Sequence, residues 1–382
     1  MHGIFRDETA LARRNISSAT KQICCRTSAR LVFCVVLFLW RPLAGRFTNL
    51  KPRANILSPA TTITHTIDLH PAWRPVAEQR IRQPFPRPSI KSLLLAVALF
   101  LLTLGTALAA GTQFAVTFKR SEPASFTELL RAYQLFYQHP VALLAGLPFA
   151  LTLLTILLAH ELGHFFACRR HHIHSSYPFF IPFPSLIGTF GAFILMRSPI
   201  RTNRSLFDVG ASGPLVGFVF AVPALLYGIL HAKLISSPYP QTQLAFGNPL
   251  LLHVLSAMLY PSVPVKNLLI DPIGRAAWVG LFATSLNLLP AGQLDGGHIL
   301  RSISPRAHYV VSWLLPIALI FLGYVGQSFL WYVWAALLLG IKFLRVAPIY
   351  DPEELDPSRR FGAFLALMVF VFSFMPMPIL VS

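Results

Sequence analysis

Two histidines and a glutamate lie together in an otherwise apolar stretch of the chain. The run 157–166 reads LLAHELGHFF and contains His160, Glu161 and His164. Residues four apart share one face of a helix, so both imidazole rings can direct a nitrogen atom at a single point. Ionisable side chains are costly to bury in hydrocarbon unless a partner compensates them. We therefore expect a metal site with His160 and His164 as ligands; the alternative is a coincidence of residue types.

Glu161 directly follows the first of these ligands. Its side chain is expected to project beside the metal, where a carboxylate can hold a water molecule and act as general base. Two histidines spaced four apart, with a glutamate after the first, form the HExxH arrangement of zinc hydrolases. The pattern indicates hydrolysis as the chemistry of this site.

A catalytic zinc site needs a third protein ligand and an open position for water. The best candidate is Asp295, the only carboxylate in the apolar stretch 276–300. It lies in the segment 287–298, NLLPAGQLDGGH, where Pro290 and several glycines interrupt what would otherwise be a helix. Broken backbone at membrane depth is tolerated where it lines a watery cavity. Asn287 could donate its amide N–H to a substrate or an oxyanion; pairing with freed backbone near Pro290 is an equal alternative.

The composition indicates a membrane protein. Of the 382 residues, 54% are hydrophobic and only 12% are charged, with a mean hydropathy of +0.60, whereas soluble chains carry about 25% charged residues. Residues 1–91 hold 15 basic and 4 acidic residues, or +11 of the net charge of +18. Because the positive charge is concentrated in this tail, no nucleic-acid partner is expected. A fibrous or wholly disordered chain is excluded by the same composition.

Long apolar runs predict an all-α polytopic membrane protein with about seven transmembrane helices. The expected spans are 93–110, 142–166, 209–230, 276–290 (extending toward 298), 309–325, 328–344 and 362–381. A shorter apolar piece, 247–260, is expected to be re-entrant or interfacial. The chain thus divides into a basic N-terminal tail, 1–91, expected to be mostly disordered, and a transmembrane domain, 92–382.

The distribution of lysine and arginine predicts the orientation of the spans. With the basic tail in the cytoplasm, the inside loops and span ends carry eleven basic residues and the outside loops carry six. The spans 142–166 and 276–298 then run in the same direction. Both motifs are therefore expected at a similar depth, toward the cytoplasmic end.

Taken together, the two motifs resemble those of the site-2 protease family of intramembrane zinc metalloproteases. That family's signature is HExxH followed much later by NxxPxxxLDG, and this chain has HELGH at 160–164 and NLLPAGQLDG at 287–296. The resemblance covers roughly 90–345. The runs YPFFIP at 177–182 and GTFGAF at 188–193 are similar to the branch shared by bacteria and chloroplasts. The stretch 231–275 is too short for the PDZ domain found in some members.

The resemblance implies one zinc ion per chain, bound by His160, His164 and Asp295. It implies Glu161 as the catalytic base, Asn287 near the substrate carbonyl, and a small membrane-embedded β-hairpin near the active site. The implied function is hydrolysis of a peptide bond in a transmembrane helix of a membrane-protein substrate, as in regulated intramembrane proteolysis. Substrate and membrane lipid are the expected partners, and a multi-pass location in a bacterial inner membrane is expected.

The residues between the two motifs fit the need of such a reaction. A peptide bond in a transmembrane helix is shielded by its own hydrogen bonds, so a substrate must unwind locally. The segment 179–195 is rich in aromatic residues and contains Pro182, Pro184, Gly188 and Gly191, which is typical of short strands and turns. An edge strand there could pair with the unwound substrate; a simple connecting loop is the alternative.

Other interpretations remain open at this point. The chain could be a catalytically silent scaffold, although His160, Glu161, His164 and Asp295 are all present, or a transporter, which should contain internal repeats. Asp208 is expected to cap the helix that follows it, with a ligand role as the less favoured alternative. The histidines His171, His172, His174 and His298 could have a secondary role, but polar residues flanking a membrane are more common.

Overall fold

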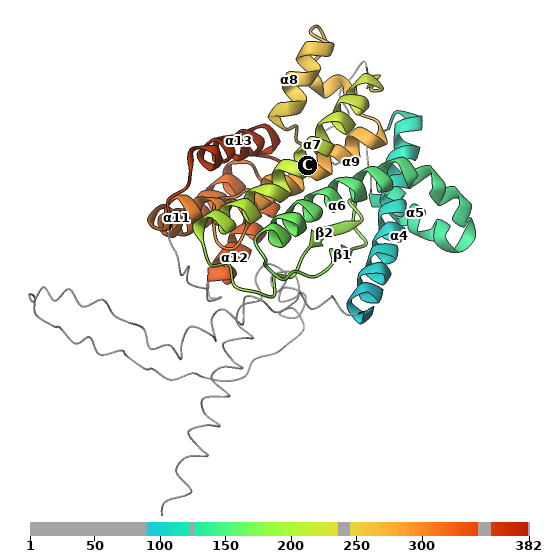
Figure 1. The fold of residues 1–382 in the computed structure, drawn as a ribbon. Helices are drawn as coiled ribbons and strands as arrows, with labels where there is room; N and C mark the ends of the chain where they lie inside the picture. The colour runs from blue at the N-terminus through green and yellow to red at the C-terminus, as the bar shows by residue number, and fades with distance from the viewer. Residues whose placement is uncertain (1–89, 123–125, 236–244, 343–352, 381–382) are drawn as a thin grey trace, which may run out of the picture.

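The described residues form a mostly helical bundle. The computed structural model describes residues 90–122, 126–235, 245–342 and 353–380 (Figure 1). The predicted basic tail, 1–91, lies almost wholly outside these residues, so the boundary expected near residue 91 stays a prediction. In the described part, regular structure begins with helix α4 (Ile90–Arg120).

Among the described residues, four helical segments are long and apolar enough to cross a membrane. They are α4, the continuous helical stretch Pro140–Arg170, α7 (Asn203–Leu230) and α11 (Pro305–Val325). The stretch Pro140–Arg170 consists of a 3-10 turn, η2 (Pro140–Gly146), followed by α6 (Leu147–Arg170). These four segments overlap four of the seven predicted spans.

The other three predicted spans contain shorter helices in the described residues. They are α9 (Pro272–Asn287), α12 (Phe329–Lys342) and α13 (Pro357–Ser373). Of the predicted span 328–344, the last two residues lie outside the described part. The mostly helical, membrane-spanning character is confirmed, whereas the count of seven spans is not.

Large apolar side chains remain exposed along the longest helices. On α4 Leu101 and Leu102 are each 59% exposed, and on α11 Ile317 is 65% and Phe321 is 68% exposed. A helix that is apolar on its outer face as well as its inner face is typical of a lipid environment. The chain is thus an integral membrane protein.

Smaller elements connect these helices. Helix α5 (Phe126–Gln138) follows α4, and α8 (Leu250–Leu259) lies at one end of the bundle in Figure 1. The described parts of the stretch 231–271 contain only α8, a 3-10 turn and two-residue strands. These are β3 (Lys233–Leu234), β4 (Ala245–Phe246), η3 (Val265–Asn267) and β5 (Leu268–Leu269); β6 (Ile379–Leu380) pairs with β4.

The centre of the bundle is formed by α6, α7 and α9, which lie side by side in Figure 1. Glycines permit the close crossings: a Cβ atom on Gly163 of α6 would stand 2.6 Å from the Ser212 carbonyl of α7. Gly228 of α7 and Gly274 of α9 approach in the same way. Small residues at such crossings allow helices to pack in a membrane, where the hydrophobic effect does not drive them together.

Helix α7 begins with a capping box. The Thr202 hydroxyl accepts a hydrogen bond from the Ser205 N–H, and the Ser205 hydroxyl accepts from the Thr202 N–H. The expectation that Asp208 caps this helix is therefore wrong, because Asp208 lies a turn and a half inside it. Its carboxylate instead pairs with His171 and Arg359, at 2.7 Å each.

A β-hairpin lies beside α6 and against α4. Strands β1 (Phe179–Pro182) and β2 (Thr189–Phe193) pair antiparallel, with Phe179 opposite Phe193 and Ile181 opposite Gly191. The Thr106 hydroxyl of α4 donates a hydrogen bond to the Gly188 carbonyl in the connecting turn. The hairpin predicted for 179–195 is thus present; its depth in a membrane stays a prediction.

Candidate metal centre

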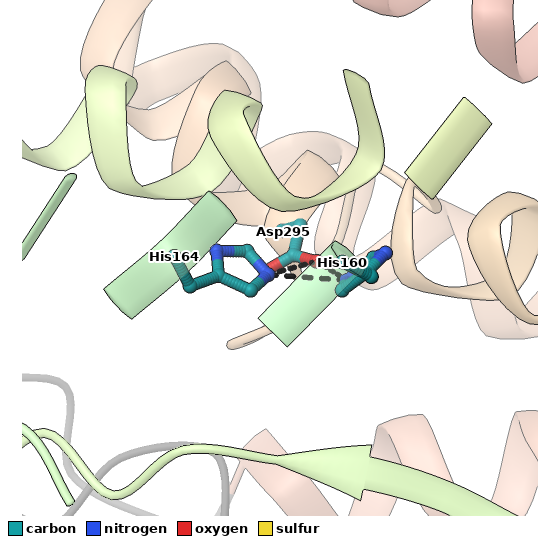
Figure 2. A group of neighbouring side chains, drawn as sticks. All are labelled: His160, His164 and Asp295. Atoms are coloured by element: carbon teal, nitrogen blue, oxygen red, sulfur yellow. Dashed lines mark hydrogen bonds and ion pairs between the residues drawn. The ribbon is translucent and has the colours of Figure 1, made fainter. Parts of the chain in front are cut away.

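Three predicted ligands meet at one point in the interior. His160 and His164 lie one turn apart on α6, and Asp295 is the first residue of α10 (Asp295–Ile303). Nε2 of His160 lies 3.1 Å from Nε2 of His164, and Oδ2 of Asp295 lies 3.3 Å and 3.2 Å from these two nitrogens. Figure 2 shows the three side chains pointing toward one another. Among the described residues they form the one cluster of three such groups placed to share a metal.

The spacing of these atoms fits zinc. Two ligands at 2.0–2.1 Å from a tetrahedral zinc ion stand about 3.3 Å apart, close to the three separations observed here. Two imidazoles and one carboxylate are a common donor set for a catalytic zinc with one open position. His160, His164 and Asp295 are therefore positioned to hold the metal.

The backbone of α7 orients one of the imidazole rings. Nδ1 of His164 donates a hydrogen bond of 2.7 Å to the Val209 carbonyl. With its proton on Nδ1, the ring leaves the Nε2 lone pair free toward His160 and Asp295, which is the usual arrangement for a metal-bound histidine. Sequence reasoning missed Val209, because a backbone carbonyl leaves no signature in residue type.

A non-helical segment between α9 and α10 places Asp295 beside the two histidines. Helix α9 ends at Asn287 and α10 begins at Asp295, and Gly292 between them has a φ of +61°. A Cβ atom on Gly296 would stand 2.0 Å from the Leu288 carbonyl, so the glycine after Asp295 is required for α10 to start against the end of α9. The predicted interruption of the helix is confirmed.

A cavity opens beside the three ligands. Its lining includes Glu161, Asn287, residues 190–194 of the hairpin region and Trp334 of α12. Glu161 is only 5% exposed, in an otherwise apolar part of α6. Nδ2 of Asn287 lies 3.3 Å from Nε2 of His160. The two residues predicted to act on a substrate therefore face the same space as the ligands.

Two other histidines named from the sequence, His298 and His171, lie outside the cluster of three ligands. His298 lines the cavity but does not belong to the cluster of three ligands, and no hydrogen-bond partner for its Nε2 is found among the described residues. Nε2 of His171 lies 2.7 Å from Asp208. His171 is thus part of an ion-pair network and of no second metal cluster in the described residues.

That network connects three helices at the end of α6. Arg359 of α13 donates two hydrogen bonds to Asp208 of α7, from Nε at 2.8 Å and from Nη2 at 2.7 Å, and a third to Asp356 at 2.7 Å. Hydrogen bonds from Ser358 and Arg359 lower the pKa of Asp356 to about 2. The network fixes the start of α13 on α7 and on the last turn of the helix that carries both histidine ligands.

Comparison with known proteins agrees with the site. Residues 148–322 match the family model described as peptidase family M50. The chain is 30% identical over 242 residues to the probable zinc metalloprotease EGY1, chloroplastic, of Oryza sativa subsp. japonica, covering 61% of this chain and 41% of that protein. It is 30% identical over 261 residues to the probable zinc metalloprotease EGY2, chloroplastic, of Arabidopsis thaliana, covering 66% and 45%. No solved structure matches the chain.

The metal cluster of this chain thus agrees with the zinc metalloproteases to which the chain is similar. The part of the chain that resembles peptidase family M50, residues 148–322, contains all three side chains of this cluster. The matched part of the chain covers less than half the length of the relatives named above. Both relatives are named as chloroplastic proteins, so they do not support the predicted location in a bacterial inner membrane.

Proposed function

We propose that this chain is an intramembrane zinc endopeptidase that hydrolyses a peptide bond in a transmembrane helix of a membrane protein. One observation carries the proposal: Nε2 of His160, Nε2 of His164 and Oδ2 of Asp295 lie 3.1–3.3 Å apart, beside the buried Glu161. The helix that bears three of these residues belongs to a stretch long enough to cross a membrane. A hydrolytic site at that position acts on peptide bonds that are themselves in the membrane.

In this proposal His160, His164 and Asp295 are the zinc ligands. Bound zinc would lower the pKa of a water molecule and polarise the scissile carbonyl. Glu161 takes a proton from the attacking water and passes it to the leaving nitrogen as the C–N bond breaks. The water oxygen ends on the carbonyl carbon, so the products are a new carboxylate and a new amine. The Asn287 amide donates a hydrogen bond to the substrate carbonyl oxygen.

The hairpin gives the unwound substrate a partner for its backbone. Strand β1 is held against α4, and residues 190–194, which include most of β2, line the cavity. In the described sheet β2 pairs only with β1, and a Cβ atom on Gly191 would meet no atom within 4 Å, so one face of this part of β2 is open as well. We propose that an extended substrate segment adds to the free edge of β2, which would satisfy the amides and carbonyls that unwinding exposes.

The zinc content of the detergent-solubilised full chain tests the proposal, measured together with cleavage of a single-span membrane substrate. We expect one zinc per chain and cleavage that Glu161→Gln reduces by about 10²- to 10⁴-fold without loss of the metal. Zinc binding without any Glu161-dependent cleavage would favour a catalytically silent scaffold. A wild-type chain that takes up no zinc would contradict the metalloprotease function itself.

A further inference from the structure

Side chains of α11 hold the segment between α9 and α10, which ends at Asp295. Between Asn287 and Asp295 the chain is not helical, so its backbone N–H and carbonyl groups need partners other than those of a regular helix. Several of these groups bond within the segment, as the Ala291 N–H does to the Leu289 carbonyl. Gly292 differs, because both of its backbone polar groups pair with side chains of α11.

Two side chains, one turn apart on α11, make these bonds. The Gly292 N–H donates a hydrogen bond of 3.1 Å to the Ser312 hydroxyl oxygen, and Nε2 of His308 lies 3.0 Å from the Gly292 carbonyl oxygen. Because a carbonyl only accepts, the His308 ring carries a proton on Nε2 and donates it. Ser312 and His308 therefore hold Gly292 from both of its polar groups, and we call this pair of bonds the Gly292 clamp.

The Gly292 clamp lies on the inner face of α11, which is mostly apolar. Ser312 is buried and His308 is half-buried, whereas the neighbouring Tyr309 and Trp313 are 66% and 51% exposed. Polar side chains on a membrane helix are costly unless they are used. On this helix both of these inward-facing side chains bond to Gly292, a residue of another segment.

Gly292 is closely coupled to Asp295. It lies three residues before the ligand and has a φ of +61°, a conformation that is open to glycine and strained for most other residues. Its carbonyl oxygen also lies against α10: a Cβ atom on Gly297 would stand 2.7 Å from it. A displacement of Gly292 would therefore shift the first turn of α10, where the ligand is located.

We propose that His308 and Ser312 are positioning residues for the metal centre, and that they act through Gly292 to fix Asp295 at the bonding distance from both histidines. The inference rests on the proposed zinc function. Neither residue touches the metal position. Their contribution is to reduce the number of loop conformations, so that the third ligand is already in place when zinc arrives.

The inference is tested with zinc ion alone, in competition with a chromophoric chelator, on the full chain in detergent. We expect Ser312→Ala combined with His308→Leu to weaken the apparent zinc affinity about 10-fold, the lower end of the loss seen when a group that orients a ligand is removed. Ser312→Thr and His308→Gln keep the acceptor and the donor and should restore affinity. Ser256→Ala is a matched control, because this buried hydroxyl bonds only to carbonyls of its own helix, α8.

A second readout needs neither metal nor turnover. In the metal-free chain, hydrogen exchange of the peptide 288–294 should be faster in the double variant than in wild type, and restored by the Thr and Gln variants. Ser312→Ala alone serves if the double variant does not fold. Unchanged zinc affinity would overturn the positioning role, whether or not exchange is faster. A wild-type chain that binds no zinc would instead overturn the proposed function, and the inference with it.

Discussion

A Cβ atom on Gly213 would stand 2.1 Å from Nε2 of His164, the ring atom that faces His160 and Asp295. Gly213 belongs to α7, the helix whose Val209 carbonyl also orients the same ring. The neighbouring helix therefore holds the His164 ring by a hydrogen bond to Nδ1. It also leaves room beside Nε2, because Gly213 has no side chain.

The first prediction concerns this contact. Gly213→Ala should weaken zinc binding by about 100-fold, because the new methyl group must push the His164 ring out of its place. Gly217→Ala should do less, since its Cβ would stand 3.2 Å from His160 Cβ and Nδ1. Gly340→Ala on α12 is the control, with no atom within 4 Å of the added group. Zinc affinity measured by chelator competition should follow this order, and equal affinity in all three variants would contradict it.

The second prediction separates the two candidate side chains of α10. Asp295→Ala should lower zinc affinity by more than about 100-fold, the upper range for changes outside the ligand set, because it removes one of the three proposed ligands. His298→Ala should keep stoichiometric zinc, since His298 lies in the cavity lining but outside the ligand cluster. Metal analysis of the purified variants decides between them. If Asp295→Ala keeps its zinc and His298→Ala loses it, the third ligand has been misassigned.

The third prediction concerns Asn287. Its amide faces the cavity at 3.3 Å from Nε2 of His160, so Asn287→Ala should lower kcat by about 10²- to 10³-fold and leave zinc content unchanged. Asn203→Ala is a control on another helix, where the amide donates to the Glu353 carbonyl at 3.1 Å. Should Asn287→Ala turn over the substrate at the wild-type rate, the amide would have only a structural role there.

The fourth prediction concerns the ion-pair network beyond the end of α6. Arg359→Leu leaves the Asp208 carboxylate, whose side chain is 21% exposed, without its bidentate partner. We expect a loss of about 2 kcal/mol in unfolding free energy, less than for a fully buried pair. Arg360→Leu removes a 67% exposed arginine that pairs with Glu354 at 3.4 Å, and should cost less than about 1 kcal/mol. Denaturant unfolding of both variants in the same detergent makes the comparison; equal losses would contradict a special role for Arg359.

The clustering of His160, His164 and Asp295 could be predicted from the sequence because each of the two motifs is recognisable by itself. The spacing of His160 and His164 fixes their shared helix face, and Asp295 is the only carboxylate in its apolar stretch. The contacts of Gly213 with His164 and of Ser312 with Gly292 could not be predicted, because they depend on how separate helices cross. In the sequence Gly213 is one of several small residues at the start of an apolar run.

The span count illustrates a different limit. The length of an apolar stretch does not indicate where the helix within it ends. Helix α9 ends at Asn287, before Pro290, and α13 ends at Ser373, three residues before Pro376. Proline cannot continue a helix without losing a hydrogen bond, yet the hydropathy of both stretches continues beyond these points. The predicted spans 276–290 and 362–381 therefore run past the last residues of α9 and α13.

The proposed ligand Asp295 lies far from His160 and His164 in the sequence, so the ribosome makes it at a different time. Asn287 follows His160 by 127 residues, and Asp295 comes later still, so a ribosome has made α4, α6, the hairpin and α7 well before the third ligand exists. A nascent chain at that stage has His160, Glu161 and His164 but lacks Asp295. The proposed zinc site is complete only when the segment after α9 has been made, which delays the proposed activity until the hairpin and the central helices are already in place.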